Sequence, residues 1–182
     1  MTIRFVNTAD AAAMLDIYRP FITNSTTSFE IVVPTVGEFA ERITANTQKY
    51  PWLVAEANGM VAGYAYAGKH RERQAYQWSV ETSVYIHPAF YRQGIAQLLY
   101  TKLFSVLKTQ GFVNIYAGIA LPNAASAQLH RALGFEDIGV YQKIGFKFGA
   151  WHDVLWMVKY INEHQPNMPA PKGIESVLDI LT

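Results

Sequence analysis

The chain of 182 residues contains no cysteine, and this absence excludes disulfides, thiolate metal ligands and a cysteine nucleophile together. It also lacks an apolar run of the roughly 18–20 residues that a membrane-spanning helix needs. The N-terminus shows no hydrophobic stretch typical of a signal peptide, so we expect a cytoplasmic protein that has no membrane as a partner. Positive and negative charges nearly cancel, with a formal net charge of +1, which gives no reason to expect nucleic acid as a partner.

The sequence does contain enough apolar material for one core. Hydrophobic residues make up 51% of the chain and charged residues 16%, proportions typical of a globular protein. The length suits a single domain. Pro166, Pro169 and Pro171 then break regular structure before a short amphipathic end. We therefore expect one domain over residues 1–163 and a C-terminal tail over 164–182, whose role the sequence leaves open.

Hydrophobic periodicity and turn residues predict an α/β (α+β) protein. Strands are expected at residues 3–6, 52–57, 60–67, 80–86, 113–119, 140–144 and 154–161, and helices at 10–21, 35–49, 95–110 and 122–133. Asn58-Gly59 should join two of the strands in a tight hairpin, and residues 145–153 should form the turn between the last two. This order of elements predicts a mixed sheet with helices on both faces.

The segment from Val84 to Ala96 carries the clearest chemical signal. It passes from a strand through a turn that contains Gly94 into a helix, and a helix N-terminus of this kind leaves backbone N–H groups free to bind phosphate. Neither a P-loop nor a Gly-x-Gly-x-x-Gly dinucleotide fingerprint is present. The turn resembles the Gln/Arg-x-x-Gly-x-Gly/Ala signature of the GNAT superfamily of N-acetyltransferases, with Tyr91 as a departure at the first position. An ordinary connection between strand and helix is the alternative interpretation.

Four further segments narrow the resemblance to the phosphinothricin N-acetyltransferase family. They are residues 50–56 (YPWLVAE), 65–68 (AYAG), 75–85 (AYQWSVETSVY) and 145–153 (GFKFGAWHD), and the similarity spans about residues 3–161. The resemblance implies the single-domain GNAT fold, with a mostly antiparallel twisted sheet, and a homodimer. It also implies transfer of an acetyl group from acetyl-CoA to the α-amine of phosphinothricin, methionine sulfoximine or methionine sulfone, which detoxifies these herbicidal or antibiotic compounds. No metal is expected.

Two residues are candidates for proton transfer. Glu81 should lie on the strand face opposite to Val80 and Thr82, and glutamate is an uncommon strand residue. The resemblance puts the family's catalytic glutamate at this position of a Trp-x-x-Glu motif, either as the base or as an anchor for the substrate ammonium; a solvent-facing strand position is the alternative. His130 stands where many relatives carry a tyrosine that protonates the CoA thiolate, with a structural histidine as the alternative.

The resemblance also assigns residues to acetyl-CoA. The main chain is expected to bind the pantetheine and the thioester oxygen at Val84, Tyr85 and Ile86, and the pyrophosphate at Arg92, Gln93, Gly94, Ile95 and Ala96. Asn123 is expected to hydrogen-bond the cofactor, although an asparagine after a proline is also a common helix cap.

The candidates for binding a small amino-acid-like substrate lie in two loops. Arg71 and Arg73 precede the fourth predicted strand, and a guanidinium can bind a carboxylate or phosphinate through two hydrogen bonds; one of the two is expected to be a solvated loop residue. Tyr76 in the same loop, and Phe29 and Glu30 in the first long loop, should complete the pocket. A basic loop disfavours polyamine or aminoglycoside substrates. A peptide N-terminus, another small amine, or a non-catalytic acyl-CoA-binding sensor are the alternatives.

Overall fold

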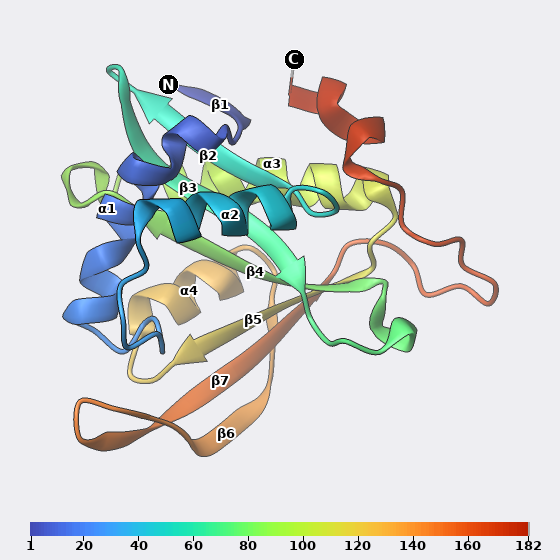
Figure 1. Cartoon of the computed structure of the whole chain (residues 1–182). Helices are drawn as coiled ribbons and strands as arrows, with labels where there is room; N and C mark the ends of the chain where they lie inside the picture. Colours follow the sequence, from blue (N-terminus) through green and yellow to red (C-terminus); the bar gives the residue numbers. More distant parts are fainter. Residues whose placement is uncertain (182) are drawn as a thin grey trace.

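The computed structural model describes residues 1–181 as a seven-stranded sheet with helices on both faces (Figure 1). The strands are β1 (Thr2–Phe5), β2 (Trp52–Ala57), β3 (Met60–Lys69), β4 (Ser79–Ile86), β5 (Asn114–Ala120), β6 (Glu136–Lys147) and β7 (Ala150–Tyr160). The α-helices are α1 (Ala11–Thr23), α2 (Val36–Asn46), α3 (Ile95–Gln110) and α4 (Ala124–Ala132). Short 3-10 helices are η1 (Thr8–Asp10), η2 (Gln74–Tyr76), η3 (Pro88–Phe90) and η4 (Ile174–Leu181). Within this described chain, no helix is both long and apolar enough to cross a bilayer.

The strand order across the sheet is β1-β2-β3-β4-β5-β7-β6. Strands β4 and β5 form the one parallel pair among the described strands, and their neighbours pair antiparallel. The predicted mixed, mostly antiparallel sheet is therefore confirmed. The predicted hairpin between β2 and β3 is confirmed as well, because Asn58 and Gly59 both have positive φ angles, 54° and 74°, as a tight two-residue turn requires.

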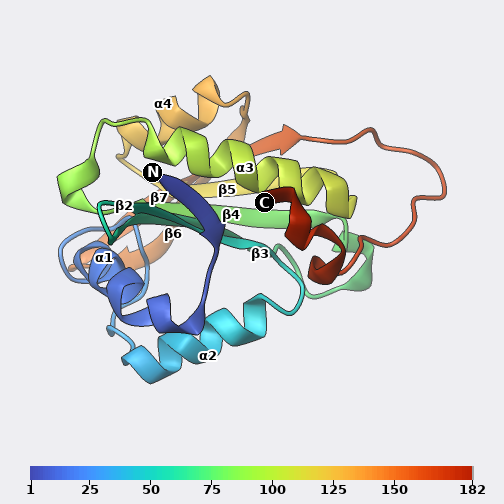
Figure 2. The ribbon, with the colours of Figure 1, turned by 90° about the horizontal axis from the view of Figure 1, so that it is seen from above.

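Helices cover the two faces of the sheet in pairs, α1 and α2 on one side and α3 and α4 on the other (Figure 2). Each face has its own apolar core, one centred on α3 and one on α1 and α2. The predicted start of α2 is confirmed by its capping box, in which the Thr35 hydroxyl accepts from the Glu38 N–H at 3.2 Å. The Glu38 carboxylate in turn accepts from the Thr35 N–H at 2.7 Å. Gly111 ends α3 with a φ of 93°, as its position in the sequence predicts.

The last hairpin is longer than the sequence predicts. The expected turn at residues 145–153 is wrong, because β6 and β7 continue to Lys147 and Ala150, which pair with each other. The true turn consists of Phe148 and Gly149, with φ angles of 52° and 74°. Phenylalanine rarely adopts a positive φ, so this turn carries no recognisable sequence signal.

The C-terminal tail folds back onto the domain. The Lys172 N–H donates to the Gln110 backbone carbonyl at the end of α3, over 2.7 Å. The Trp78 ring N–H donates to the Pro169 carbonyl, also over 2.7 Å. Within η4, Val177 is 1% exposed, and η4 lies against α3 and β1 (Figures 1 and 2). The tail therefore contributes to the apolar core.

Candidate active site

The sheet opens between its two parallel strands. Pairing between β4 and β5 ends after three residue pairs, of which Glu81 with Tyr116 is the last, and the strands then diverge (Figure 1). On its other edge β4 stays paired with β3, and the His87 N–H donates to the Ala62 carbonyl at 2.9 Å. Because N–H directions alternate along a strand, those of Val84 and Ile86 point to the open side. The gap thus presents free backbone donors.

The turn that follows β4 adds further free donors. Gly94 and Arg92 have φ angles of 75° and 61°, and α3 begins directly after them at Ile95. In the described chain no side chain caps this helix, so the first N–H groups of α3, including that of Ala96, have no partner within the helix. Gln93 is exposed, and its amide donates to the Ala89 carbonyl at 3.3 Å. The end of the gap is therefore suited to an anion.

A pocket of about 460 Å³ lies beside the gap on the α1 and α2 side of the sheet. Its walls come from the loop after α1, the loop after β3, and strands β4 to β7. The lining residues are Thr27, Phe29, Arg71, Glu81, Gly118, Ala120, Tyr141, Ile144, Val154 and Trp156. The structure therefore brings together Phe29, Arg71 and Glu81, which the sequence proposes for the site. The first and last of them are 52 positions apart in the chain.

Glu81 projects from β4 into this pocket. As predicted, it lies opposite Val80 and Thr82, which are 0% and 6% exposed. Its carboxylate is hydrogen-bonded by His70, with 2.8 Å between Nδ1 and Oε1. The His70 ring is stacked on Tyr116, with ring centroids 4.2 Å apart and planes 11° from parallel. The candidate base is thus held by an imidazole that is itself packed in place.

The comparisons with known proteins agree with this geometry. The model of the family described as "Acetyltransferase (GNAT) domain" matches residues 3–156. The chain belongs to this GNAT family. The family and the fold that the sequence predicts are both confirmed.

Three individual proteins show how close the relationship is. The chain is 41% identical to a phosphinothricin N-acetyltransferase of Streptomyces viridochromogenes, over 93% of this chain and 90% of the relative. It is 36% identical to an L-methionine sulfoximine/L-methionine sulfone acetyltransferase of Salmonella typhimurium, over 90% and 96%. A solved GNAT phosphinothricin acetyltransferase of Sinorhizobium meliloti, in complex with AcCoA, has a TM-score of 0.88 at 35% identity and covers 93% of this chain, with 94% of its own chain covered.

In this GNAT chain the open edge of β4 does not include every residue expected there. Tyr85 lies between Val84 and Ile86, so its N–H points to β3. Its ring packs in the core, 4.8 Å from the Tyr18 ring and 5.1 Å from the Phe21 ring between centroids. Neither group of Tyr85 faces the gap, whereas the N–H groups of both neighbours do.

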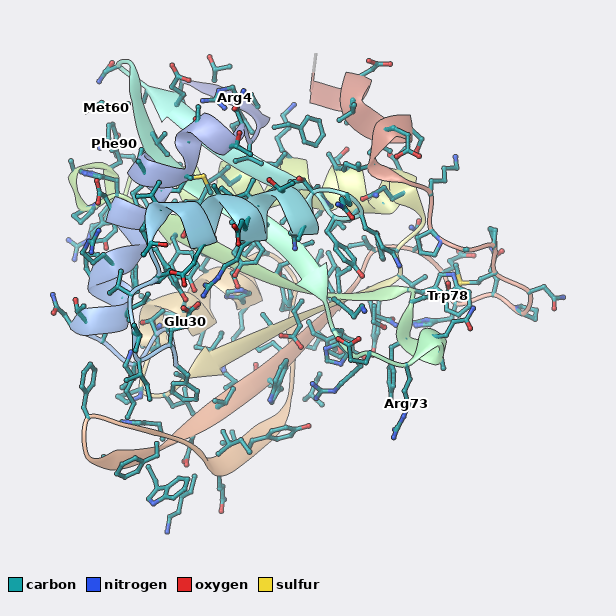
Figure 3. All side chains as sticks on the ribbon, in the orientation of Figure 1. Arg4, Glu30, Met60, Arg73, Trp78 and Phe90 are labelled. Carbon is teal, nitrogen blue, oxygen red and sulfur yellow. The ribbon has the colours of Figure 1, made fainter. Side chains whose placement is uncertain are left out.

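The two loop arginines have different surroundings. Arg71 lines the pocket, and its guanidinium carbon lies 5.9 Å from the centre of the Trp156 ring. Arg73 is exposed and points away from the molecule (Figure 3). Tyr76 does not line the pocket, and its ring meets the edge of His70 at 6.2 Å between centroids. Arg71 is therefore the substrate candidate, and Arg73 matches the expected solvated arginine.

Phe29 and Glu30 point in different directions although they are adjacent. Phe29 lines the pocket, and its loop is fixed to β6 by Lys147, whose Nζ donates to the Ser28 carbonyl at 2.6 Å. Glu30 instead accepts from Arg42 at 2.7 Å and from the Tyr18 hydroxyl at 3.1 Å, in a separate small cavity under α1 and α2. Glu30 is therefore not among the residues that line the main pocket, and its contact with substrate stays a prediction.

Asn123 caps α4, and His130 lies within this helix. The Asn123 side chain caps the helix by accepting from the Ser126 N–H at 3.1 Å. His130 is 3% exposed, with Nδ1 2.8 Å from the Ser126 carbonyl and Nε2 3.3 Å from the Tyr100 hydroxyl. Burial lowers the pKa of His130, and the bond to the Ser126 carbonyl partly opposes this. These contacts support the structural interpretation of His130, and its role as an acid stays a prediction.

Two residues of the site, Trp156 in the pocket and His70 in the adjoining cavity, had no sequence signal that pointed to them. His70 lies in a charged loop, and its side-chain hydrogen bond goes to Glu81 in the following strand. Trp156 belongs to a strand that would be expected to pack in the core. The strand register places both residues at the site. Gly68 pairs with Glu81, and His70 follows Gly68 by two residues. Trp156 pairs with Gly118, which lines the pocket. A prediction of strand pairing, and not of strand positions alone, would have been needed to find them.

Proposed function

We propose that this acetyltransferase moves the acetyl group of acetyl-CoA onto the α-amine of a small amino-acid analogue. The substrates of its relatives, phosphinothricin, methionine sulfoximine and methionine sulfone, are the class we assign to it. The observation that carries the proposal is the pocket that Glu81 and Arg71 line together beside the β4–β5 gap. A carboxylate there can accept a proton from an ammonium group, and a guanidinium can bind an anionic or polar head group.

Different residues of the chain have different roles in this proposed reaction. An amine that arrives as ammonium has no free electron pair, so one of its protons must first move to the carboxylate of Glu81. The N–H groups of Val84 and Ile86 face the gap and are suited to the amide arm and to the thioester oxygen, where negative charge develops. The free N–H groups around Gly94 are suited to the pyrophosphate. Acetyl-CoA supplies the activated acyl group.

The remaining walls suit a compact substrate with an apolar stem. Phe29, Ile144 and Trp156 give the pocket apolar surface, and its volume of about 460 Å³ lies within the range of small-ligand sites. The one guanidinium gives the pocket a positive charge beside the carboxylate. A zwitterionic amino acid with a polar head is therefore a better match than a polycation.

Release of free CoA from acetyl-CoA, measured on a panel of amines, tests this proposal. The panel contains phosphinothricin, methionine sulfoximine, methionine sulfone, methionine, a polyamine and a short peptide with a free N-terminus. We expect turnover with the first three and the highest kcat/KM among them. Binding of acetyl-CoA without turnover on any amine would support a sensor and overturn the proposal, as would turnover confined to the peptide or the polyamine.

We also propose that two copies of the chain associate through β6. This strand is the last in the sheet order, and its hairpin exposes a group of large apolar side chains, here called the β6–β7 patch: Ile138, Val140, Tyr141, Ile144, Phe146, Phe148 and Trp151. Exposed apolar surface of this kind usually marks an interface. The patch also reaches the pocket at Tyr141 and Ile144, so a second copy would lie next to the active site.

Light scattering at micromolar concentration checks this association. We expect a mass of about twice the 20.5 kDa of the single chain, and the single mass for Phe146→Asp. A wild-type protein that has the single mass would contradict it.

Because the acetyl donor is a cytoplasmic metabolite, we propose that the enzyme works in the cytoplasm.

A further inference from the structure

His70 lies directly behind the carboxylate of Glu81. Its Nδ1 is 2.8 Å from Glu81 Oε1, and the side chain of His70 is 11% exposed against 37% for Glu81. Glu81 lines the main pocket. His70 lines a second, adjoining cavity of about 260 Å³. The carboxylate therefore borders the main pocket, and the imidazole contacts it from the side of the adjoining cavity.

The imidazole is held from several elements at once. Tyr116 of β5 stacks on its face, and the rings of Trp156 in β7 and Tyr76 in η2 meet it edge-on, with centroids 6.0 Å and 6.2 Å away. Its place is fixed by the end of β3, where the pairing of Lys69 with Val80 is the last before the loop. The ring therefore has one orientation, with Nδ1 toward Glu81.

The charged and titratable groups around this ring come from four elements and its own loop. Glu81 of β4 faces Nδ1. Tyr116 and Tyr76 contact the ring, and Tyr141 of β6 lines the same cavity. Arg71 follows His70 in the chain and donates to its backbone carbonyl at 3.5 Å. Among these described groups, Glu81 is the one carboxylate, so the hydrogen bond of Nδ1 has a single acceptor to serve.

We propose that His70 is a positioning residue for the acetyl transfer, which donates its Nδ1–H to Glu81 and holds the carboxylate in one orientation. An ionised carboxylate only accepts hydrogen bonds, so a contact of 2.8 Å with it needs the proton on Nδ1. This bond occupies Oε1 and leaves Oε2 for the ammonium proton of the substrate. The proton then moves from nitrogen to Oε2, and the electron pair of the broken N–H bond stays on the amine. The inference rests on the proposed function, in which Glu81 is the base.

Two substitutions separate the hydrogen bond from the packing. His70→Phe keeps a ring that can stack on Tyr116 but has no N–H, whereas His70→Asn keeps an N–H near the position of Nδ1 but has no ring. We expect His70→Phe to lower kcat roughly tenfold or more at pH 7, because a misplaced catalytic group is costly. Its acetyl-CoA KM should stay unchanged, so the loss should appear in kcat and not in cofactor binding. His70→Asn should retain kcat within about threefold.

The same pair of variants can overturn the inference. Wild-type kcat in His70→Phe, or an equal loss of kcat in both variants that follows their melting temperatures, would show that His70 only packs. Glu81→Gln, assayed in parallel, distinguishes the two claims. A large loss in that variant together with none in His70→Phe overturns the role of His70 alone, whereas no loss in either overturns the proposed mechanism as well.

Nitrogen NMR of the histidine side chains gives a readout that does not depend on activity. Comparison with the spectrum of His70→Asn identifies the His70 signals among those of the five histidines. We expect the wild-type His70 to carry its proton on Nδ1 at neutral pH, and this preference to weaken in Glu81→Gln. A proton on Nε2 alone in the wild type would contradict the inference.

Discussion

The ring of Phe29 lies so close to the backbone of Gly145 that a Cβ atom at position 145 would overlap it. The two residues are 116 positions apart, and their contact joins the loop after α1 to β6. Both sides of this contact border the pocket, since Phe29 and Ile144 line it. The glycine is thus required by the wall of the substrate pocket and not by a turn, because it has no positive φ.

Gly145→Ala should displace Phe29 and widen the pocket. We expect the KM for the amino-acid analogue to rise about tenfold, which corresponds to about 1.4 kcal/mol of lost binding. Gly139→Ala is the matched control, because Gly139 is also in β6 and a Cβ there meets no atom within 4 Å. Equal KM values for the two variants would mean that Phe29 does not shape the pocket.

Glu81→Gln should lower kcat by about 10²–10⁴ at pH 7, the usual range for a positioned proton acceptor. The affinity for acetyl-CoA should be retained, and the loss should shrink at high pH, where more of the amine is already deprotonated. Glu72→Gln is the control, because Glu72 is exposed and pairs with Lys69 at 2.9 Å. An unchanged kcat in Glu81→Gln would remove this residue from the mechanism.

Arg71→Ala should raise the KM for the analogue more than it lowers kcat, because the guanidinium borders the pocket. Arg73→Ala, which changes an exposed arginine of the same loop, should behave like the wild type.

A site with polar donors should also give methionine sulfone a kcat/KM at least roughly tenfold above methionine, whose thioether would leave those donors unpaired at ~1–3 kcal/mol. Steady-state kinetics checks both expectations. Equal KM values for Arg71→Ala and Arg73→Ala would contradict the role of Arg71. Equal kcat/KM values for methionine and its sulfone would contradict the role of the polar donors.

Gly94→Ala should weaken acetyl-CoA binding. A Cβ at Gly94 meets no atom within 4 Å, but the φ of 75° makes any side chain there strained, at a cost on the order of 1–3 kcal/mol. Gly59→Ala is the control for strain, since Gly59 has a φ of 74° and similar open space in a distant hairpin. Both variants should lose similar melting temperature, and calorimetry should show weaker acetyl-CoA binding in Gly94→Ala alone. Equal affinities would show that Gly94 serves the fold and not the ligand.

Val177→Ala should destabilise the whole domain through the tail. Val177 is 1% exposed, whereas its neighbour Leu178 is 46% exposed. Loss of buried methyl groups should cost about 1–2 kcal/mol of unfolding free energy, and Leu178→Ala should cost much less. Denaturant unfolding measures both. If the two variants were equally stable, the tail would be a loosely attached appendage.

The sequence predicts the fold well because its signals are local. Asn58-Gly59, the capping box at Thr35 and the glycine after α3 each determine a turn or a helix end through their own chemistry. The turn at Phe148 could not be predicted, because its positive φ is imposed by the long antiparallel pairing of β6 with β7 and not by the residue type.

The candidate site is predictable only in part, since side-chain direction depends on neighbours that are distant in sequence. Phe29 and Glu30 are equally good candidates until the pairing of Glu30 with Arg42 directs it away. Likewise Arg71 and Arg73 differ only through the packing of Arg71 against Trp156. His70 could not be found because its hydrogen bond to Glu81 exists only once β3 and β4 are in register.

The early end of the ladder between β4 and β5 has a mechanical consequence. Three residue pairs join the two halves of the sheet, so rotation of one half against the other should be among the softest motions of the molecule. The pocket takes Glu81 from the first half and Gly118 and Trp156 from the second, so this rotation changes the width of the gap and of the pocket together. A ligand that fixes one width lowers the cost of fixing the other. Acetyl-CoA and the amine should therefore each increase the affinity for the other by the same factor, as thermodynamic linkage requires.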